Sequence, residues 1–286
     1  MTKQAQTPMD FVEDLSRRLS RGDLDLPPCP QVALRIQDLL QEEDASPGEL
    51  AKVSLLDPIL TGRIISVANS AMFSRSLHPT TDIRSAIARI GFDMVKNLAF
   101  EVALDKAFDF NGSSGSRELN RSIRTNSRQV GALAHFLAKR YLPGVHADEA
   151  MLAGLLHEVG KLYILARADG FPALFGDPLT LSDLLQDWHA ALGHAILDAW
   201  GLPASVVTAV GEQDGVEAVP KDSPLLAIVL RAAIALNRPC QAGANGEVQP
   251  IAHLPALRFL DLDEASARGI VKRACSLAKS FGALFG

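Results

Sequence analysis

The apolar residues of this chain recur at the spacing of an α-helix along almost its whole length. Val32, Ile36, Leu39 and Leu40, for example, lie three or four positions apart and would share one helical face. The alternation of every second residue that marks a half-buried strand is nearly absent. Leucine and alanine, which favour helices over strands, supply much of the 48% hydrophobic content. The sequence therefore predicts an all-α fold.

Signals for helix N-termini support this prediction. Thr7-Pro8-Met9-Asp10 and Ser46-Pro47-Gly48-Glu49 each place a hydroxyl cap, a proline and an acid in the order of a helix start. Asp57-Pro58 repeats the cap followed by proline. Further helices are expected at approximately 82–90, 92–108, 118–141, 148–166, 181–200, 204–213, 223–236 and 263–284.

One compositional break divides the chain. Residues 111–116, Asn-Gly-Ser-Ser-Gly-Ser, are small and polar and lie between apolar segments, as in a linker. We therefore expect an N-terminal helical lobe over 1–110, a linker over 111–116, a second helical lobe over 117–216 and a C-terminal helical extension over 217–286.

The charge and the cysteines of the chain indicate its cellular compartment and exclude one class of partner. The formal net charge is −5, and no run of lysine or arginine forms a basic stripe, so binding to nucleic acid is not expected. Cys29, Cys240 and Cys275 lie far apart, as in a protein of the reducing cytoplasm. The N-terminus lacks the apolar core of a signal peptide, and the longest apolar stretch, 225–236, is too short to span a membrane. We expect a cytoplasmic protein without membrane contacts.

The segment 26–73 carries an ordered series of motifs. Leu26-Pro27 with Pro30 is followed by a helical segment, then by Asp57-Pro58 with Leu60, then by Ala68-Asn69-Ser70. This series resembles the opening of the HDOD family, and the resemblance, with the second lobe included, spans about two-thirds of the chain. Each motif also has a purely structural interpretation, because Asp57 can cap a helix and Asn69 can tie backbone groups at a helix end.

The second lobe resembles the HD phosphohydrolases to which the HDOD family is related. Residues 153–162 match the stretch A-G-L-L-H-D-I-G-K-L, with Glu158 in place of aspartate after His157. Residues 188–193 and 200–203 match the family's H-A-x-x-G and W-x-L-P stretches and retain His189. The HD enzymes spread metal ligands over several helices so that the metal ions activate a water for attack on phosphorus.

Several of those ligand positions are altered here. The resemblance places Asn126, Glu158, Gln213 and Ala233 where the enzymes have ligands. The extra methylene of Glu158 would displace its carboxylate by ~1 Å, beyond the tolerance of a tuned site. We therefore expect no bound metal, with His157, Glu158 and His189 as remnants of the site. The family-motif positions expected to be structural are Leu26, Pro27, Pro30, Asp57, Pro58, Ala68, Asn69, Ser70, Gly160, Lys161, Trp200 and Pro203.

The resemblance implies a role in bacterial signal transduction, since such domains often occur beside receiver, GGDEF or EAL modules. The chain carries none of these modules, so signalling partners, kinases included, are expected in trans. We predict a non-catalytic regulatory protein that needs no cofactor and acts by binding other proteins. Two alternatives stay open: a residual metal-dependent phosphohydrolase acting on a nucleotide or cyclic dinucleotide, and a sensor that binds a nucleotide without hydrolysing it. The sequence leaves the oligomeric state open.

Overall fold

A computed structural model describes residues 8–26, 29, 31–42, 45–70, 73, 79–109, 114–168, 178–214, 223–242, 269–270, 272–273 and 276. In this part of the chain the regular elements are all helices, which confirms the all-α prediction. The helices are α1 (Pro8–Arg21), α2 (Gln31–Leu39), α3 (Pro47–Ser54), α4 (Pro58–Ala68), α5 (Ile83–Ile90), α6 (Phe92–Ala107), α7 (Ser114–Tyr141), α8 (Ala147–Leu156), α9 (Val159–Ala168), α11 (Pro178–Ala199), α12 (Ala204–Gly211) and α13 (Leu225–Ala242).

Two of the predicted helix starts form as expected. Ser46 accepts a hydrogen bond from the Glu49 N–H, and the Glu49 carboxylate accepts one from the Ser46 N–H, which is a capping box. The Asp57 carboxylate accepts hydrogen bonds from the N–H groups of Ile59 and Leu60. α1 begins at Pro8, and its expected cap, Thr7, lies outside the described residues.

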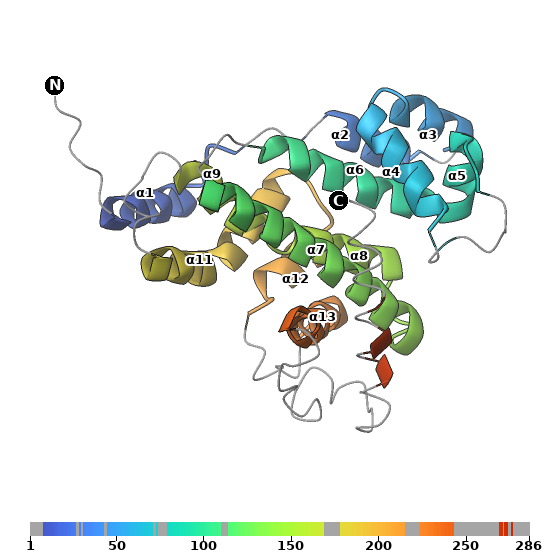
Figure 1. Cartoon of the computed structure of the whole chain (residues 1–286). Coiled ribbons are helices and arrows are strands. Elements are labelled where there is room, and N and C mark those ends of the chain that lie inside the picture. The colour runs from blue at the N-terminus through green and yellow to red at the C-terminus, as the bar shows by residue number, and fades with distance from the viewer. Residues whose placement is uncertain are drawn as a thin grey trace.

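The long helix α7 lies at the centre of the molecule. Figure 1 shows α2 to α5 grouped at one end beside α6, while α8 runs next to α7 and α11, α12 and α13 lie on the other side. α1 packs against α11 and buries Phe11 and Leu15, although the sequence assigns α1 to the N-terminal lobe. The first helix of the chain therefore packs on the second half of the fold.

Several helix boundaries differ from the sequence prediction, and two of the differences change how the chain is divided. The helix expected over 148–166 is interrupted at His157 and Glu158, which form a turn between α8 and α9. The apolar pattern runs unbroken through this turn, so periodicity gives no sign of it. Residues 114–116 of the expected linker form the first turn of α7, and residues 110–113 lie outside the described part. The helix expected over 263–284 lies mostly outside it too.

Glycines allow two helix pairs to approach backbone to backbone. A Cβ atom added to Gly154 of α8 would lie 2.5 Å from the Cα atom of Gly131 of α7. A Cβ atom added to Gly160 of α9 would lie 2.1 Å from the carbonyl oxygen of His189 of α11. Both distances are far below van der Waals contact, so any side chain at Gly154 or Gly160 would force the helices apart.

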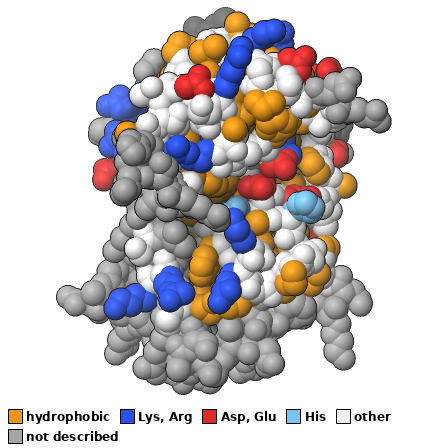
Figure 2. Space-filling model, turned by 90° about the vertical axis from the view of Figure 1, so that its right-hand side faces the viewer, with side chains coloured by type: hydrophobic (Ala, Val, Ile, Leu, Met, Phe, Trp, Pro, Cys, Tyr) orange, Lys and Arg blue, Asp and Glu red, His pale blue; other side chains and the backbone are white. Residues whose placement is uncertain are grey.

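The surface has mixed character. Figure 2 shows one face of the molecule, on which hydrophobic, basic and acidic side chains are interspersed. Among the helices that the structure describes, none combines the length and the apolar character needed to cross a membrane.

We expect Gly160→Ala to lower the free energy of unfolding by about 1–3 kcal/mol, because the added methyl group displaces the backbone at His189. The matched control is Gly62→Ala on α4, where an added Cβ meets nothing within 4 Å. This control should raise stability by about 0.5–1 kcal/mol through helix propensity. Urea unfolding followed by circular dichroism measures both. Equal stability of Gly160→Ala and the unmodified protein would contradict the close approach of α9 and α11.

Candidate functional site

The turn between α8 and α9 forms part of a pocket of about 310 Å³. The lining comes from α7, α9, α11 and α13, from the α8–α9 turn and from the segment that follows α12, so the pocket exists only in the folded chain. Its lining residues are Ser122, Ile123, Asn126, His157, Glu158, Lys161, Gln186, His189, Gln213, Asp214, Ile234 and Arg238. The structure thus brings together the predicted positions Asn126, His157, Glu158, His189 and Gln213, with Lys161 beside them.

Both carboxylate oxygens of Glu158 are occupied. Oε2 accepts a hydrogen bond from Asn126 Nδ2 at 2.8 Å and a longer one from the Ser127 hydroxyl at 3.4 Å. Oε1 accepts from the ammonium of Lys161 at 2.7 Å. Burial opposes ionisation of this side chain. The electrostatic interactions with His157 and then Lys161, together with the hydrogen bonds from Lys161 and Asn126, outweigh burial and lower the pKa of Glu158. The carboxylate is therefore charged and neutralised internally.

The two histidines adopt the same arrangement. The Nδ1 atom of His157 lies 2.7 Å from the Gly154 carbonyl oxygen, and that of His189 lies 2.9 Å from the Gln186 carbonyl oxygen. A carbonyl only accepts, so each Nδ1 carries the proton and each Nε2 keeps its lone pair. Burial lowers the pKa of His157 to about 4 and also lowers that of His189. Both rings are neutral at pH 7.

Amide side chains connect the remaining elements. Gln213, which follows α12, donates from Nε2 to the His157 carbonyl oxygen at 2.8 Å. Asn237 of α13 donates from Nδ2 to Asn126 Oδ1 at 2.7 Å and to Gln129 Oε1 at 3.2 Å. We call the side chains of Asn126, Glu158, Lys161, Gln213 and Asn237 the polar network. It links α7, α9, α12 and α13 around the His157–Glu158 turn.

The position at which the resemblance expects the final acid lies on α13. Ala233 is fully buried in the hydrophobic core and does not line the pocket. The polar contact from α13 comes instead from Asn237, one helical turn further along the same face. Asn237 follows an apolar run, and that isolated amide was the available signal. The sequence also gave no reason to select Ser122, Gln186, Asp214 or Arg238, which line the pocket.

The residues present do not fit a metal cluster of the HD type. In the described part of the chain, no group of three His, Cys, Asp or Glu side chains is placed to hold a metal ion. Both oxygens of the best-placed carboxylate, Glu158, already accept hydrogen bonds, one from an amide and one from an ammonium group. A divalent ion prefers several oxygen or imidazole ligands, and amides replace them here.

The motif positions of the first lobe lie away from the pocket and make local contacts. Asp57 caps α4 and pairs with Lys106, and Asn69 exchanges two hydrogen bonds of 2.8 Å with the backbone of Thr80. Ser70 donates to the carbonyl of Val67 at 2.7 Å. The remaining first-lobe positions are Leu26, half-buried; Pro58, exposed in the first turn of α4; Ala68, buried; and Pro27 and Pro30, outside the described residues.

In the second half, Trp200 is buried with its ring centroid 6.5 Å from that of Phe108, and Pro203 precedes α12 as its N-cap. Trp200 therefore joins the end of α11 to the end of α6.

A family model for the HDOD domain matches residues 26–216. Among solved structures, a proposed metal-dependent phosphohydrolase from Shewanella amazonensis is 27% identical, covers 94% of this chain and 99% of its own, and has a TM-score of 0.73. An HDOD domain protein of unknown function from Geobacter sulfurreducens is 21% identical, covers 95% of this chain and 99% of its own, and has a TM-score of 0.69.

Two further relatives are longer than this chain. A proposed signal transduction protein from Marinobacter aquaeolei is 22% identical, with a TM-score of 0.67, and is matched over 100% of this chain and 67% of its own. An uncharacterized protein of Treponema pallidum is 23% identical over 218 residues, which is 72% of this chain. The chain spans 41% of the length of that Treponema relative.

Stability should fall as the pH is lowered from 6.5 to about 4. Burial lowers the pKa of both His135 and His157 to about 4, so the unfolded chain takes up these protons at a higher pH than the folded protein. The stabilisation is complete above pH 6.5 and is lost towards pH 4, by about 3 kcal/mol for each histidine.

The variant His157→Gln should remove one of these two contributions and show a shallower decline. Denaturant unfolding of both proteins at matched pH values measures this decline in the free energy of unfolding. The contribution of the carboxyl groups is common to both proteins and cancels in the comparison. An unchanged decline would mean that His157 is not buried as a neutral ring.

Proposed function

The chain belongs to the HDOD domain family, and we propose that it is a non-catalytic regulatory protein of bacterial signal transduction that acts by binding other proteins. The observation that carries the proposal is the polar network. Three of its members, Asn126, Glu158 and Gln213, stand where the resemblance places the metal ligands of the related enzymes. Here they hydrogen-bond to other groups of the protein instead.

The energetics of the network favour this proposal. A metal ion would have to displace the Lys161 ammonium from one oxygen of Glu158 and the Asn126 amide from the other. It would also leave the ammonium of Lys161, whose side chain is 19% exposed, without its carboxylate partner, and the loss of a partly buried ion pair is unfavourable. The Lys161 ammonium group therefore competes with a metal ion for the Glu158 carboxylate.

The alternative, a residual metal-dependent phosphohydrolase, has support of its own. The Nε2 atoms of His157 and His189 keep their lone pairs, which is the form that binds metal. The Shewanella protein at 27% identity is a proposed metal-dependent phosphohydrolase. Against this stands the set of Asn126, Gln213 and Asn237, since neutral amides are weak ligands for a catalytic divalent ion.

Metal content decides between the two. Protein purified and incubated with Mn²⁺ or Fe²⁺ should retain well under one equivalent after desalting, and should show no metal-dependent hydrolysis of nucleotide phosphodiesters. The triple variant Asn126→His, Glu158→Asp, Gln213→His restores ligand types at three positions and should retain more metal than the unmodified protein. Stoichiometric metal in the unmodified protein, lost in His157→Ala, would overturn the non-catalytic proposal.

A second candidate function is sensing of a small ligand, and one observation favours it. The Oε1 atom of Gln213 is buried without a hydrogen-bond partner among the described residues, and Gln213 lines the pocket of about 310 Å³. An unsatisfied buried acceptor is costly, so a ligand with a hydrogen-bond donor would be stabilised there. A nucleotide that raises the melting temperature of the protein, but not that of Gln213→Leu, would support this function.

Binding to other proteins is supported by exposed apolar side chains. At the turn between α3 and α4, Leu55, Leu56 and Ile59 are 57%, 61% and 52% exposed. Grouped apolar residues on a surface mark interaction sites more often than single ones do. We propose partners in trans of receiver, GGDEF/EAL or kinase type, in the cytoplasm and without nucleic acid or membrane.

Cross-linking in cells followed by mass spectrometry tests the choice of partner. Signalling proteins of these classes should be recovered with the unmodified protein and lost with Leu55→Asp/Leu56→Asp. The matched control is Leu179→Asp on α11, where an equally apolar side chain is 77% exposed and stands apart from that turn. Recovery that is equal in all three proteins would exclude the α3–α4 turn as the binding surface.

A further inference from the structure

The first half of α7 carries four arginines on one face. Arg117, Arg121, Arg124 and Arg128 are spaced by four, three and four residues, which aligns them along one side of a helix. The sequence shows no continuous basic run, and only the helix brings these residues into a stripe. Like charges at such spacing destabilise a helix, so the stripe calls for a physical explanation.

The arginines line a pocket of about 260 Å³ with Asp105, Asp109 and Asn120. This arginine pocket shares no lining residue with the pocket at His157. Both border α7, but the residues that line them lie on different sides of the helix. The arginine pocket is therefore a separate site.

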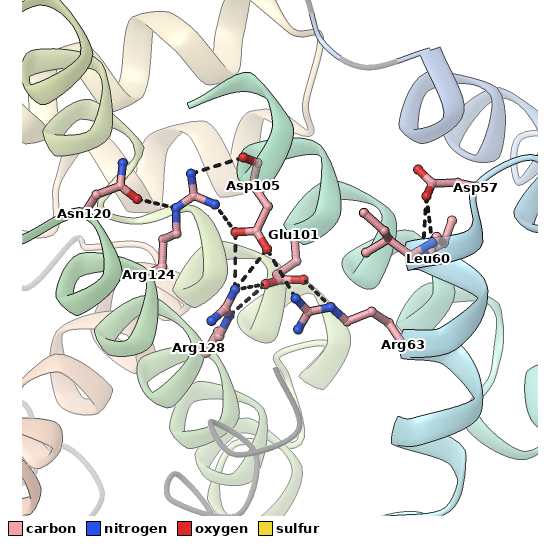
Figure 3. Close-up of polar contacts among 9 residues, drawn as sticks. Asp57, Leu60, Arg63, Glu101, Asp105, Asn120, Arg124 and Arg128 are labelled. Atoms are coloured by element: carbon pink, nitrogen blue, oxygen red, sulfur yellow. Dashed lines mark hydrogen bonds and ion pairs between the residues drawn. The ribbon is translucent and has the colours of Figure 1, made fainter. Parts of the chain in front are cut away.

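A largely buried ionic cluster, drawn in Figure 3, includes Asp105, Arg124 and Arg128 from the lining of the arginine pocket. Arg128 donates to Glu101 at 2.7 Å and to Asp105 at 3.1 Å, and Arg63 of α4 donates to Asp105 at 3.3 Å. Arg124 also pairs with Asp105, and its Nε donates to Asn120 at 2.6 Å. The guanidinium groups of Arg124 and Arg128 are thus held in place by several bonds each.

The pocket has an excess of positive charge. Four arginines and two aspartates line it, in a chain whose net charge is −5. Arg121 is exposed, and none of the described carboxylates forms an ion pair with it. The ionic cluster therefore neutralises the inner arginines, and Arg121 adds positive charge at the opening.

We propose that the arginine pocket binds a phosphoryl group, either as a small free anion or as part of a small ligand. A guanidinium group presents its donors in a planar fork that matches phosphate oxygens two at a time. A doubly charged phosphate matches the excess of two positive charges, and its several acceptor oxygens match several donors. The volume of the pocket lies just below the usual range for ligand pockets, which suits a small anion.

A nucleic-acid backbone is a poorer match. Such a partner requires phosphate contacts along an extended basic surface, whereas the excess charge here is confined to one pocket. The proposal rests on residues outside the polar network, so it stands or falls independently of the proposed function.

Isothermal titration calorimetry with inorganic phosphate and with pyrophosphate, at low ionic strength, tests the site. The unmodified protein should bind one equivalent of either anion. Arg121→Ala should bind about tenfold more weakly or worse, since a hydrogen bond to a charged group contributes about 1.5–3 kcal/mol. Arg140→Ala is the matched control, because Arg140 is an exposed arginine at the far end of the same helix and should bind like the unmodified protein.

Two further titrations complete the test. One separates the effect of charge from that of guanidinium geometry, and the other separates a free anion from a nucleotide-like ligand. Arg121→Lys keeps the charge without the fork and should fall between the unmodified protein and Arg121→Ala. Adenosine monophosphate binding more tightly than phosphate would assign a nucleotide-like ligand, and equal or weaker binding would assign a free anion. The proposal is overturned if neither anion binds, if Arg121→Ala binds like the unmodified protein, or if Arg140→Ala weakens binding equally.

Discussion

The geometry of the second half depends on helices that touch without side chains between them. Gly154 of α8 lies against the backbone of Gly131 of α7, and Gly160 of α9 lies against the carbonyl oxygen of His189 of α11. Close packing of this kind fixes the relative position of two helices within a fraction of an ångström, because protein interiors hold few voids. Asn126 and Ser127 lie little more than one turn before Gly131, and Glu158 lies about one turn after Gly154. The same contact that joins α7 to α8 therefore brings these side chains together.

The polar network then supplies partners for the buried charge of the Glu158 carboxylate. An isolated carboxylate at the position of Glu158 would be costly, since burying an unpaired charge is unfavourable by several kcal/mol. Lys161 supplies the countercharge from the next turn of the chain, and Asn126 supplies a neutral donor from another helix. Asn237 in turn orients the Asn126 amide by donating to its oxygen. Each member satisfies a neighbour, so the network stabilises the crossing of four elements without an external ligand.

The features that sequence reasoning recovered are local ones. Ser46 and Asp57 cap their helices through residues two or three positions away, and the helical period of the apolar residues extends over whole segments. The break at His157 and Glu158 was missed because it interrupts no apolar repeat. Asn237 was missed because its partner Asn126 lies 111 positions away in sequence. Asn126, Glu158 and His189, which motif matching selected, line one pocket, while Ala233 is buried in the core one turn before Asn237 on α13.

The two pockets beside α7 differ in whether a charged side chain has an ion-pair partner, and the difference follows the burial of that side chain. Around Glu158, which is 4% exposed, water cannot screen an unpaired group, and the carboxylate is paired with Lys161. Around Arg121, which faces solvent, an unpaired guanidinium stays hydrated and costs little until an anion replaces that water. Adjacent residues of α7 contact the two regions: Ser127 donates to Glu158, and Arg128 donates to Glu101 and Asp105. One face of α7 is thus neutralised by the polar network, while another keeps a charged side chain in contact with solvent.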